Sequence, residues 1–171
     1  MVDGPARHDP VWHIRATDHL AMREAGSVGR MKLEPLDPSL RSLLTSPSPA
    51  TLTLYREGGR AITSPVWFRV DGDWFEIVVA ASDRKLDHLR ADPRCSLLVF
   101  EAVSPFRGVQ VTGDAAIAPD EGARTRLAIA SAYLGLEGAR GYADLSRRQP
   151  GFVIRLPVTA AIGWDLSDKL P

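Results

Sequence analysis

The segment Asp71-Gly-Asp-Trp-Phe-Glu-Ile-Val-Val-Ala-Ala-Ser-Asp-Arg-Lys-Leu-Asp-His-Leu-Arg-Ala-Asp-Pro-Arg-Cys-Ser-Leu-Leu-Val-Phe100 predicts a turn, a strand, a short helix, a Pro stop and a second strand. Arg84 and Lys85 stand in the first turn of the expected helix. Adjacent guanidinium and ammonium groups beside the free backbone N–H groups of a helix start favour a phosphate or another anion. The sequence therefore indicates a site for the anionic tail of a cofactor at this helix.

Alternating apolar residues predict strands on both sides of this segment. Glu57-Gly-Gly-Arg60 is typical of a hairpin turn, and the strands around it suggest a meander of three antiparallel strands that ends at Val79. Six strands with segregated helices predict a mainly β fold, a closed or nearly closed antiparallel barrel. The six expected strands cover residues 51–55, 61–70, 74–79, 94–101, 108–118 and 151–164.

Helical spacing predicts three further helices, the first from Asp37-Pro-Ser-Leu to about Thr45, where Asp37 can cap the helix and Pro fills its first position. Another is expected after Pro119, and the last over Gly138–Arg148. Residues 1–30 lack sustained periodicity and are expected to be a loose leader, or an extension upstream of a natural start at Met31. The folded domain is therefore expected over residues 31–171.

The composition fits one globular domain, because the chain has 171 residues, 44% of them hydrophobic, and a formal net charge of zero. Nothing in this balance predicts a nucleic-acid or membrane partner. No apolar run approaches the roughly 18 residues that span a bilayer, and the N-terminus has no apolar secretory core, so a cytoplasmic location is expected. The lone Cys95 lies in an apolar run and is interpreted as a buried structural thiol.

Several motifs, taken in order, carry a resemblance to a known superfamily. They are Leu52-Thr-Leu, Gly59-Arg-Ala-Ile-Thr-Ser-Pro-Val-Trp-Phe68, Asp71-Gly-Asp, Ser82-Asp-Arg-Lys85 and Leu89-Arg-Ala-Asp-Pro-Arg94. Downstream, Phe106-Arg-Gly-Val-Gln-Val-Thr-Gly113, Pro150-Gly-Phe-Val-Ile-Arg-Leu156 and Gly163-Trp-Asp165 continue the pattern. Over about two thirds of the chain, the sequence resembles the pyridoxamine-phosphate-oxidase-like split β-barrel superfamily, in its flavin and deazaflavin oxidoreductase branch.

The resemblance implies a six-stranded FMN-binding split barrel that forms a homodimer, with two cofactor sites at the subunit interface. Each site would hold flavin mononucleotide (FMN) or the deazaflavin coenzyme F420. Arg84 and Lys85 match the family's phosphate-binding pair. The segment Thr63, Ser64, Pro65, Val66 and Trp67 matches the strand that lines the ring through backbone groups, while Val78, Val79 and Ala80 would face the cofactor from the neighbouring strand. Trp164 of the second subunit would help to shape the substrate pocket.

The sequence departs from the family at Asp83, where flavin-binding oxidases of the group commonly have Ser or Thr. A carboxylate there repels a phosphate unless it caps the helix or pairs with Arg84. The histidines are also unlike those of authentic pyridoxamine-phosphate oxidases, because all four precede the C-terminal region that holds the substrate in those enzymes. His88 is interpreted as a helix-face residue and not as a haem ligand.

The expected activity is hydride transfer between a reduced deazaflavin or flavin and a small unsaturated acceptor such as a quinone or enone. The cofactor ring performs that chemistry, so no catalytic side chain is required and none is assigned. F420 is favoured over FMN because the chain has 18 Arg and only 3 Lys, a bias typical of GC-rich genomes and suited to an anionic tail. The alternative is a non-catalytic protein that stores or sequesters the cofactor.

Overall fold

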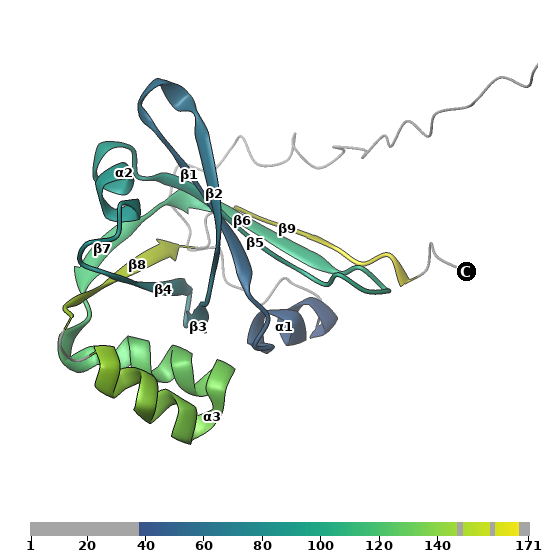
Figure 1. Cartoon of the computed structure of the whole chain (residues 1–171). Helices are drawn as coiled ribbons and strands as arrows, with labels where there is room; N and C mark the ends of the chain where they lie inside the picture. The colour runs from purple at the N-terminus through teal and green to yellow at the C-terminus, as the bar shows by residue number, and fades with distance from the viewer. Residues whose placement is uncertain (1–37, 147–148, 158–159, 168–171) are drawn as a thin grey trace, which may run out of the picture.

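The computed structural model describes residues 38–146, 149–157 and 160–167, and the expected leader at residues 1–30 lies outside them. The described chain is mainly β, with two antiparallel sheets and few helices (Figure 1). The five-stranded sheet has the order β2-β1-β5-β6-β9, and the four-stranded sheet has the order β3-β4-β8-β7. The strands are β1 (Ala50–Tyr55), β2 (Ala61–Val66), β3 (Arg69–Asp71), β4 (Trp74–Ala80), β5 (Arg94–Phe100), β6 (Gly108–Asp114), β7 (Ala116–Pro119), β8 (Gly151–Pro157) and β9 (Ala160–Trp164).

Three α-helices accompany the sheets. The helix expected near Asp37 is α1 (Pro38–Thr45), and the helix that follows the Arg-Lys pair is α2 (Lys85–Ala91). The two helices expected after Pro119 form α3 (Arg124–Ser146), which is broken at Gly135, where φ is 72° and ψ is 171°. Short 3₁₀ turns, η1 (Glu57–Gly59) and η2 (Glu121–Ala123), precede β2 and α3.

The prediction of six strands in one barrel is not confirmed, because three of the expected strands cross between the sheets. The expected strand 61–70 divides into β2 and β3 at Trp67 and Phe68, 108–118 divides into β6 and β7 at Ala115, and 151–164 divides into β8 and β9. Nine strands result, and neither sheet closes on itself. The predicted succession of three antiparallel strands is confirmed as pairings, since β1 pairs with β2 and β3 pairs with β4, but the middle strand divides at Trp67 and Phe68, so the three do not form one sheet.

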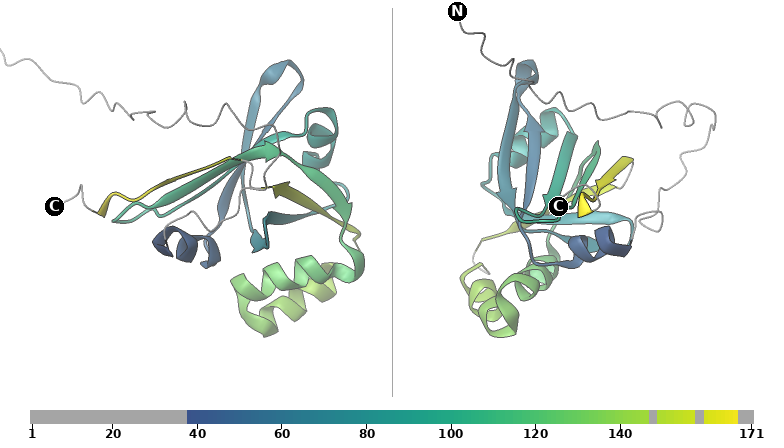
Figure 2. Two further views of the ribbon diagram at one scale, coloured as in Figure 1. Left: turned by 180° about the vertical axis from the view of Figure 1, so that it is seen from behind. Right: turned by 90° about the vertical axis from the view of Figure 1, so that its right-hand side faces the viewer.

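The main core lies between the two sheets. The five-stranded sheet contributes Leu52 and Leu97, and the four-stranded sheet contributes Phe75 and Ile154, all without measurable exposure. Helix α1 adds Leu40, Leu43 and Leu44 to the same cluster and lies along the ribbon formed by β5, β6 and β9. Figure 2 shows that this ribbon extends well beyond the rest of the molecule.

Helix α3 covers the outer face of the four-stranded sheet, where Val153, Ile129 and Ala130 are buried. Its Tyr133 hydroxyl donates a hydrogen bond to the backbone oxygen of Ser48 (2.9 Å) and accepts one from the backbone N–H of Phe68 (3.3 Å). The ring of Tyr133 stacks on Trp67, with 4.9 Å between the ring centroids. These contacts hold α3 against the point at which the chain crosses from one sheet to the other.

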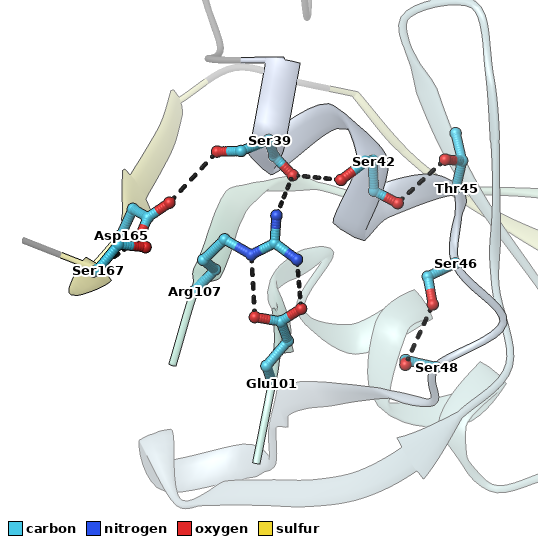
Figure 3. Close-up of polar contacts among 9 residues, drawn as sticks. All are labelled: Ser39, Ser42, Thr45, Ser46, Ser48, Glu101, Arg107, Asp165 and Ser167. Carbon is cyan, nitrogen blue, oxygen red and sulfur yellow. Dashed lines mark hydrogen bonds and ion pairs between the residues drawn. The ribbon is translucent and has the colours of Figure 1, made fainter. Parts of the chain in front are cut away.

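An arginine network holds α1 against the projecting ribbon (Figure 3). Both nitrogens of one edge of the Arg107 guanidinium bind the Glu101 carboxylate, and its third nitrogen donates to the backbone oxygen of Ser39 (3.1 Å). The Ser39 hydroxyl contacts Asp165, just beyond β9, at 3.4 Å. Hydrogen bonds from Arg107 hold the pKa of Glu101 below its usual range, so this pair stays charged at neutral pH.

In the described part of the chain, the helices are too short or too polar to serve as membrane spans.

Candidate functional site

The hairpin between β1 and β2 forms one wall of the candidate site. Gly58 and Gly59 have φ angles of 80° and 78°, which glycine adopts without steric cost, and the Arg56 N–H donates to the Arg60 oxygen (2.8 Å) below them. The strand register pairs Leu54 with Ile62, so their side chains share a face of the hairpin. The tight turn therefore places the side chains of the two flanking strand ends, Leu54 and Ile62, on the same face of the sheet.

A pocket of about 160 Å³ lies between this hairpin and α2. Two aliphatic side chains and a serine come from the hairpin, and charged side chains come from both the hairpin and the start of α2. Three cations and one carboxylate leave two net positive charges around the pocket when histidine is neutral. The residues that line it are Leu54, Arg56, Ile62, Ser64, Asp83, Arg84, Lys85 and His88.

The structure therefore brings three of the sequence-predicted site residues together: Ser64 from β2, and Arg84 and Lys85 from the start of α2. Lys85 is the first residue of the helix and Arg84 immediately precedes it. Leu86 and Leu89, buried in the main core, fix this helix beside β1. Within the described residues, the Arg84 side chain has no hydrogen bond or ion pair to another protein group, so its charge is available to an anion.

Asp83 caps α2, which was one of the two alternatives that the sequence left open. Its carboxylate accepts the backbone N–H of Lys85 (2.9 Å) and lies 3.3 Å from the Lys85 ammonium, while its backbone oxygen accepts the N–H of Leu86 (3.1 Å). Two of the N–H groups that the sequence analysis treated as free are thus already bound. An anion in this pocket must depend on the side chains of Arg84 and Lys85 more than on the helix backbone.

Strand β2 is an edge strand of the five-stranded sheet. Hydrogen-bonded pairs alternate along an antiparallel ladder, and Arg56 with Arg60 is such a pair, so Ile62 and Ser64 bond toward β1. The backbone N–H and carbonyl of Thr63 then point to the open edge. Pro65, which has no N–H, is tolerated at this kind of edge. The hydroxyl of Thr63 lies 3.1 Å from that of Thr53, on the face opposite the pocket.

The remaining residues of the predicted ring-lining set lie elsewhere. Val66 is buried in the core, and Trp67 packs on α3 through Tyr133. Val78, Val79 and Ala80 belong to β4 in the other sheet, where Val79 is part of the core. None of these five residues lines the pocket beside Arg84 and Lys85. Their contact with a cofactor ring stays a prediction.

Trp164 lies at the end of β9, opposite Gly108 of β6. A Cβ atom at position 108 would come within 2.0 Å of the indole ring, so the ring rests directly on the glycine backbone. Strands β2 and β9 are the two edges of the five-stranded sheet, four strand spacings or roughly 19 Å apart. Trp164 could therefore reach a ligand on β2 only from a second copy of the chain.

The sequence motifs did not identify four of the residues that line the pocket. Leu54 and Ile62 were not singled out, although the hairpin register places them beside Arg56. Arg56 was not assigned to the site, and His88 was interpreted only as a helix-face residue. The interpretation of Cys95 as a buried thiol is confirmed: it is 3% exposed, and burial raises its pKa to about 12. The thiol therefore stays protonated at neutral pH and is a poor nucleophile.

Comparison with known proteins assigns most of this chain to a family. Residues 36–165 match the family model described as pyridoxamine 5'-phosphate oxidase. The chain belongs to this family. Membership confirms the superfamily that the sequence motifs indicated. No protein of a curated set matches the chain at a significant level.

Several solved structures have a similar fold. A conserved hypothetical protein of Mycobacterium tuberculosis matches with a TM-score of 0.65 and 22% identity, over 76% of this chain and 85% of that one. An F420 reductase matches with a TM-score of 0.61 and 24% identity, over 74% of this chain and 98% of that one. A haem storage protein of Vibrio cholerae matches with a TM-score of 0.56 and 16% identity, over 77% and 94%. At these identities the likeness shows the fold and leaves the ligand open.

The cap on α2 generates a stability prediction. Replacing Asp83 with Ala removes the acceptor of the Lys85 N–H and should lower the free energy of unfolding by about 1 kcal/mol, whereas Asp83→Asn, which keeps an acceptor oxygen, should cost less than about half of that. Asp87→Ala is the matched control, because Asp87 lies on the same helix and makes only an exposed pair with Arg90. Urea unfolding measures all three variants. Equal losses for Asp83→Ala and Asp87→Ala would contradict the cap.

Proposed function

We propose that the pocket between the β1–β2 hairpin and α2 binds the phosphate of a flavin-type coenzyme, and that the protein is an oxidoreductase that passes a hydride from reduced F420, or alternatively FMN, to a small unsaturated acceptor. The observation that carries this proposal is the meeting of Arg84 and Lys85 with Ser64 in one pocket. The fold supports it, since the family is known for flavin-type chemistry and an F420 reductase has a similar structure.

The charges in the pocket suit a phosphate. Lys85 pairs with Asp83, but the guanidinium groups of Arg84 and Arg56 have no hydrogen bond or ion pair within the described residues. Guanidinium groups bind phosphate oxygens through pairs of parallel hydrogen bonds, and the Ser64 hydroxyl offers a further donor. The net positive charge compensates an anion of one to two charges, so the residues present fit the phosphate end of either coenzyme.

The ring would lie along the open edge of β2. The backbone N–H and carbonyl of Thr63 face that edge, and Pro65 leaves its own carbonyl there without a competing donor. Backbone groups held by a strand are rigid, so they orient a polar heterocycle without the entropy cost of ordering side chains. When bound, the coenzyme supplies the hydride chemistry, and the protein supplies orientation and exclusion of water.

The second candidate function is a non-catalytic protein that stores or sequesters the same coenzyme. It is favoured by one observation: the polar groups that line the pocket lie where the phosphate is proposed to bind, and within the described residues no group is assigned to orient an acceptor. The haem storage protein with a similar fold shows that the fold serves storage as well as catalysis. Both functions use the same phosphate contacts, and turnover separates them.

A homodimer would complete the site. The outer face of the five-stranded sheet carries a row in which Leu98, Gln110 and Ile162 are cross-strand neighbours, and Phe100 lies beside it. Ile162 is 58% exposed and Phe100 44% exposed, and within the described residues no helix covers this face. Burying such a surface against a second copy is favourable. It would also bring the partner's Trp164 toward the edge of β2, which a single chain cannot do.

The phosphate contacts generate the first functional prediction. The double variant Arg84→Ala/Lys85→Ala should bind FMN and F420 at least about tenfold more weakly, because two charge-assisted hydrogen-bond donors are lost. Riboflavin, which has the same ring as FMN without the phosphate, is the matched ligand and should bind wild type and variant equally. Fluorescence titration measures each affinity. An unchanged affinity for both phosphorylated coenzymes would contradict the proposed phosphate site.

A turnover assay separates the two candidate functions. With saturating reduced F420 or reduced FMN and a panel of quinones, enones and nitro compounds, we expect the absorbance of the reduced coenzyme to decay in a protein-dependent manner with at least one acceptor. A shift in coenzyme fluorescence with no oxidation across the panel would favour the storage protein. The acceptor with which the absorbance of the reduced coenzyme decays identifies the substrate class.

The dimer prediction uses two exposed apolar residues. Ile162→Lys places a charge on the outer sheet face at its edge strand β9, and we expect the dimer to become a monomer and to lose coenzyme affinity together. Leu136→Lys is the matched control: Leu136 is 70% exposed but lies on α3, away from that face, so this variant should stay dimeric. Light scattering coupled to gel filtration measures the mass. A wild-type monomer, or a dimer that only Leu136→Lys disrupts, would exclude this interface.

A further inference from the structure

We infer that Arg56 binds a second anionic group of the coenzyme and so selects a coenzyme whose phosphate continues into a carboxylate-bearing tail over one that ends in a phosphate. This inference rests on the proposed function, because it concerns the same pocket. It adds a specificity-determining residue that lies outside the Arg84-Lys85 pair and enters the pocket from a different element.

Arg56 and the Arg84-Lys85 pair line the same pocket from two different elements. Arg56 directly follows β1 at the base of the hairpin tip, whereas Arg84 and Lys85 begin α2. The Asp83 carboxylate, 3.3 Å from the Lys85 ammonium, offsets one of the charges on the α2 side. The start of α2 therefore carries about one net positive charge, and the hairpin carries another on Arg56.

Positive charge that is divided between the hairpin and α2 favours a particular charge pattern in the ligand. A terminal phosphate monoester concentrates a charge of about −1.5 to −2 on one group, and it is best bound where cations converge. A phosphodiester carries a single negative charge, and a carboxylate further along the tail carries another. Two single charges on different groups of the ligand match Arg56 on the hairpin and the net positive charge at α2, because each attraction weakens as the distance between the paired charges grows. F420, with its phosphate and glutamate tail, has this pattern, and FMN does not.

The size of the pocket agrees with two groups. A volume of about 160 Å³ has room for roughly five water molecules at about 30 Å³ each, and the five bonded heavy atoms of a phosphate fill less than that. Leu54 and Ile62 form the apolar part of the lining. A phosphate bound by Arg84 would leave space on the hairpin side, where the Arg56 guanidinium has no hydrogen bond or ion pair within the described residues.

Arg60 provides the matched control for Arg56. The two residues face each other across the hairpin, where the Arg56 N–H donates to the Arg60 oxygen at 2.8 Å, and both are exposed. Arg60, however, does not line the pocket. A general effect of removing positive charge from the hairpin would therefore be equal for the two residues, and only a direct contact would distinguish them.

The experiment measures the dissociation constants of F420 and FMN for the full-length wild type, Arg56→Ala and Arg60→Ala by fluorescence titration. We expect Arg56→Ala to weaken F420 binding about five- to tenfold and FMN binding less than twofold, and Arg60→Ala to change neither by more than twofold. The F420 effect of Arg56→Ala should shrink at high salt, since the contact is between exposed charges. Circular dichroism confirms that the variants are folded.

Equal losses for both coenzymes in Arg56→Ala, or equal effects of Arg56→Ala and Arg60→Ala, would overturn this inference and leave the proposed function standing. A wild type that binds FMN and not F420 would also overturn it, while flavin binding would remain. A wild type that binds neither coenzyme would overturn the proposed function itself and this inference with it.

Discussion

The carboxylate of Asp83 sets the net positive charge at the start of α2. By accepting the backbone N–H of Lys85 and pairing with its ammonium, it fixes the start of α2 and neutralises part of the charge there. The buried Leu86 and Leu89 then seat the helix against β1, beside the hairpin that carries Arg56. In the proposed function, the remaining positive charge is divided between Arg84 and Arg56. A carboxylate at position 83 is therefore compatible with phosphate binding by the pair that follows it.

The positions of the strands could be predicted from sequence, whereas their sheet membership could not. Alternation and turn residues located all six apolar stretches, but alternation reports only which face a residue occupies within one strand. It gives no signal at Trp67 and Phe68, where a continuous β-rich run leaves one sheet and enters the other. That crossing depends on tertiary contacts, among them the hydrogen bonds of Tyr133 to Ser48 and Phe68, which join positions distant in sequence.

The candidate site shows the same division. Arg84 and Lys85 were predictable because their spacing within a turn, strand, helix and Pro stop is local, and the family resemblance agreed with it. The role of Asp83 depended on its rotamer, so the sequence left a choice that the structure resolved in favour of the cap. The place of Trp164 follows from the strand order, which puts it at the sheet edge opposite β2. Its proposed contact with a coenzyme on β2 therefore requires a second protomer. A test of the oligomeric state is thus also a test of this part of the proposed function.

A crystal structure of the protein with its coenzyme bound would decide whether the proposed site is correct. We expect two protomers joined through their five-stranded sheets, with the coenzyme phosphate within hydrogen-bond distance of Arg84 and Lys85 and the ring along the open edge of β2. A phosphate bound elsewhere, such as the pocket beside Arg126 and Asp120 at the start of α3, or a coenzyme contacting a single isolated protomer, would contradict it.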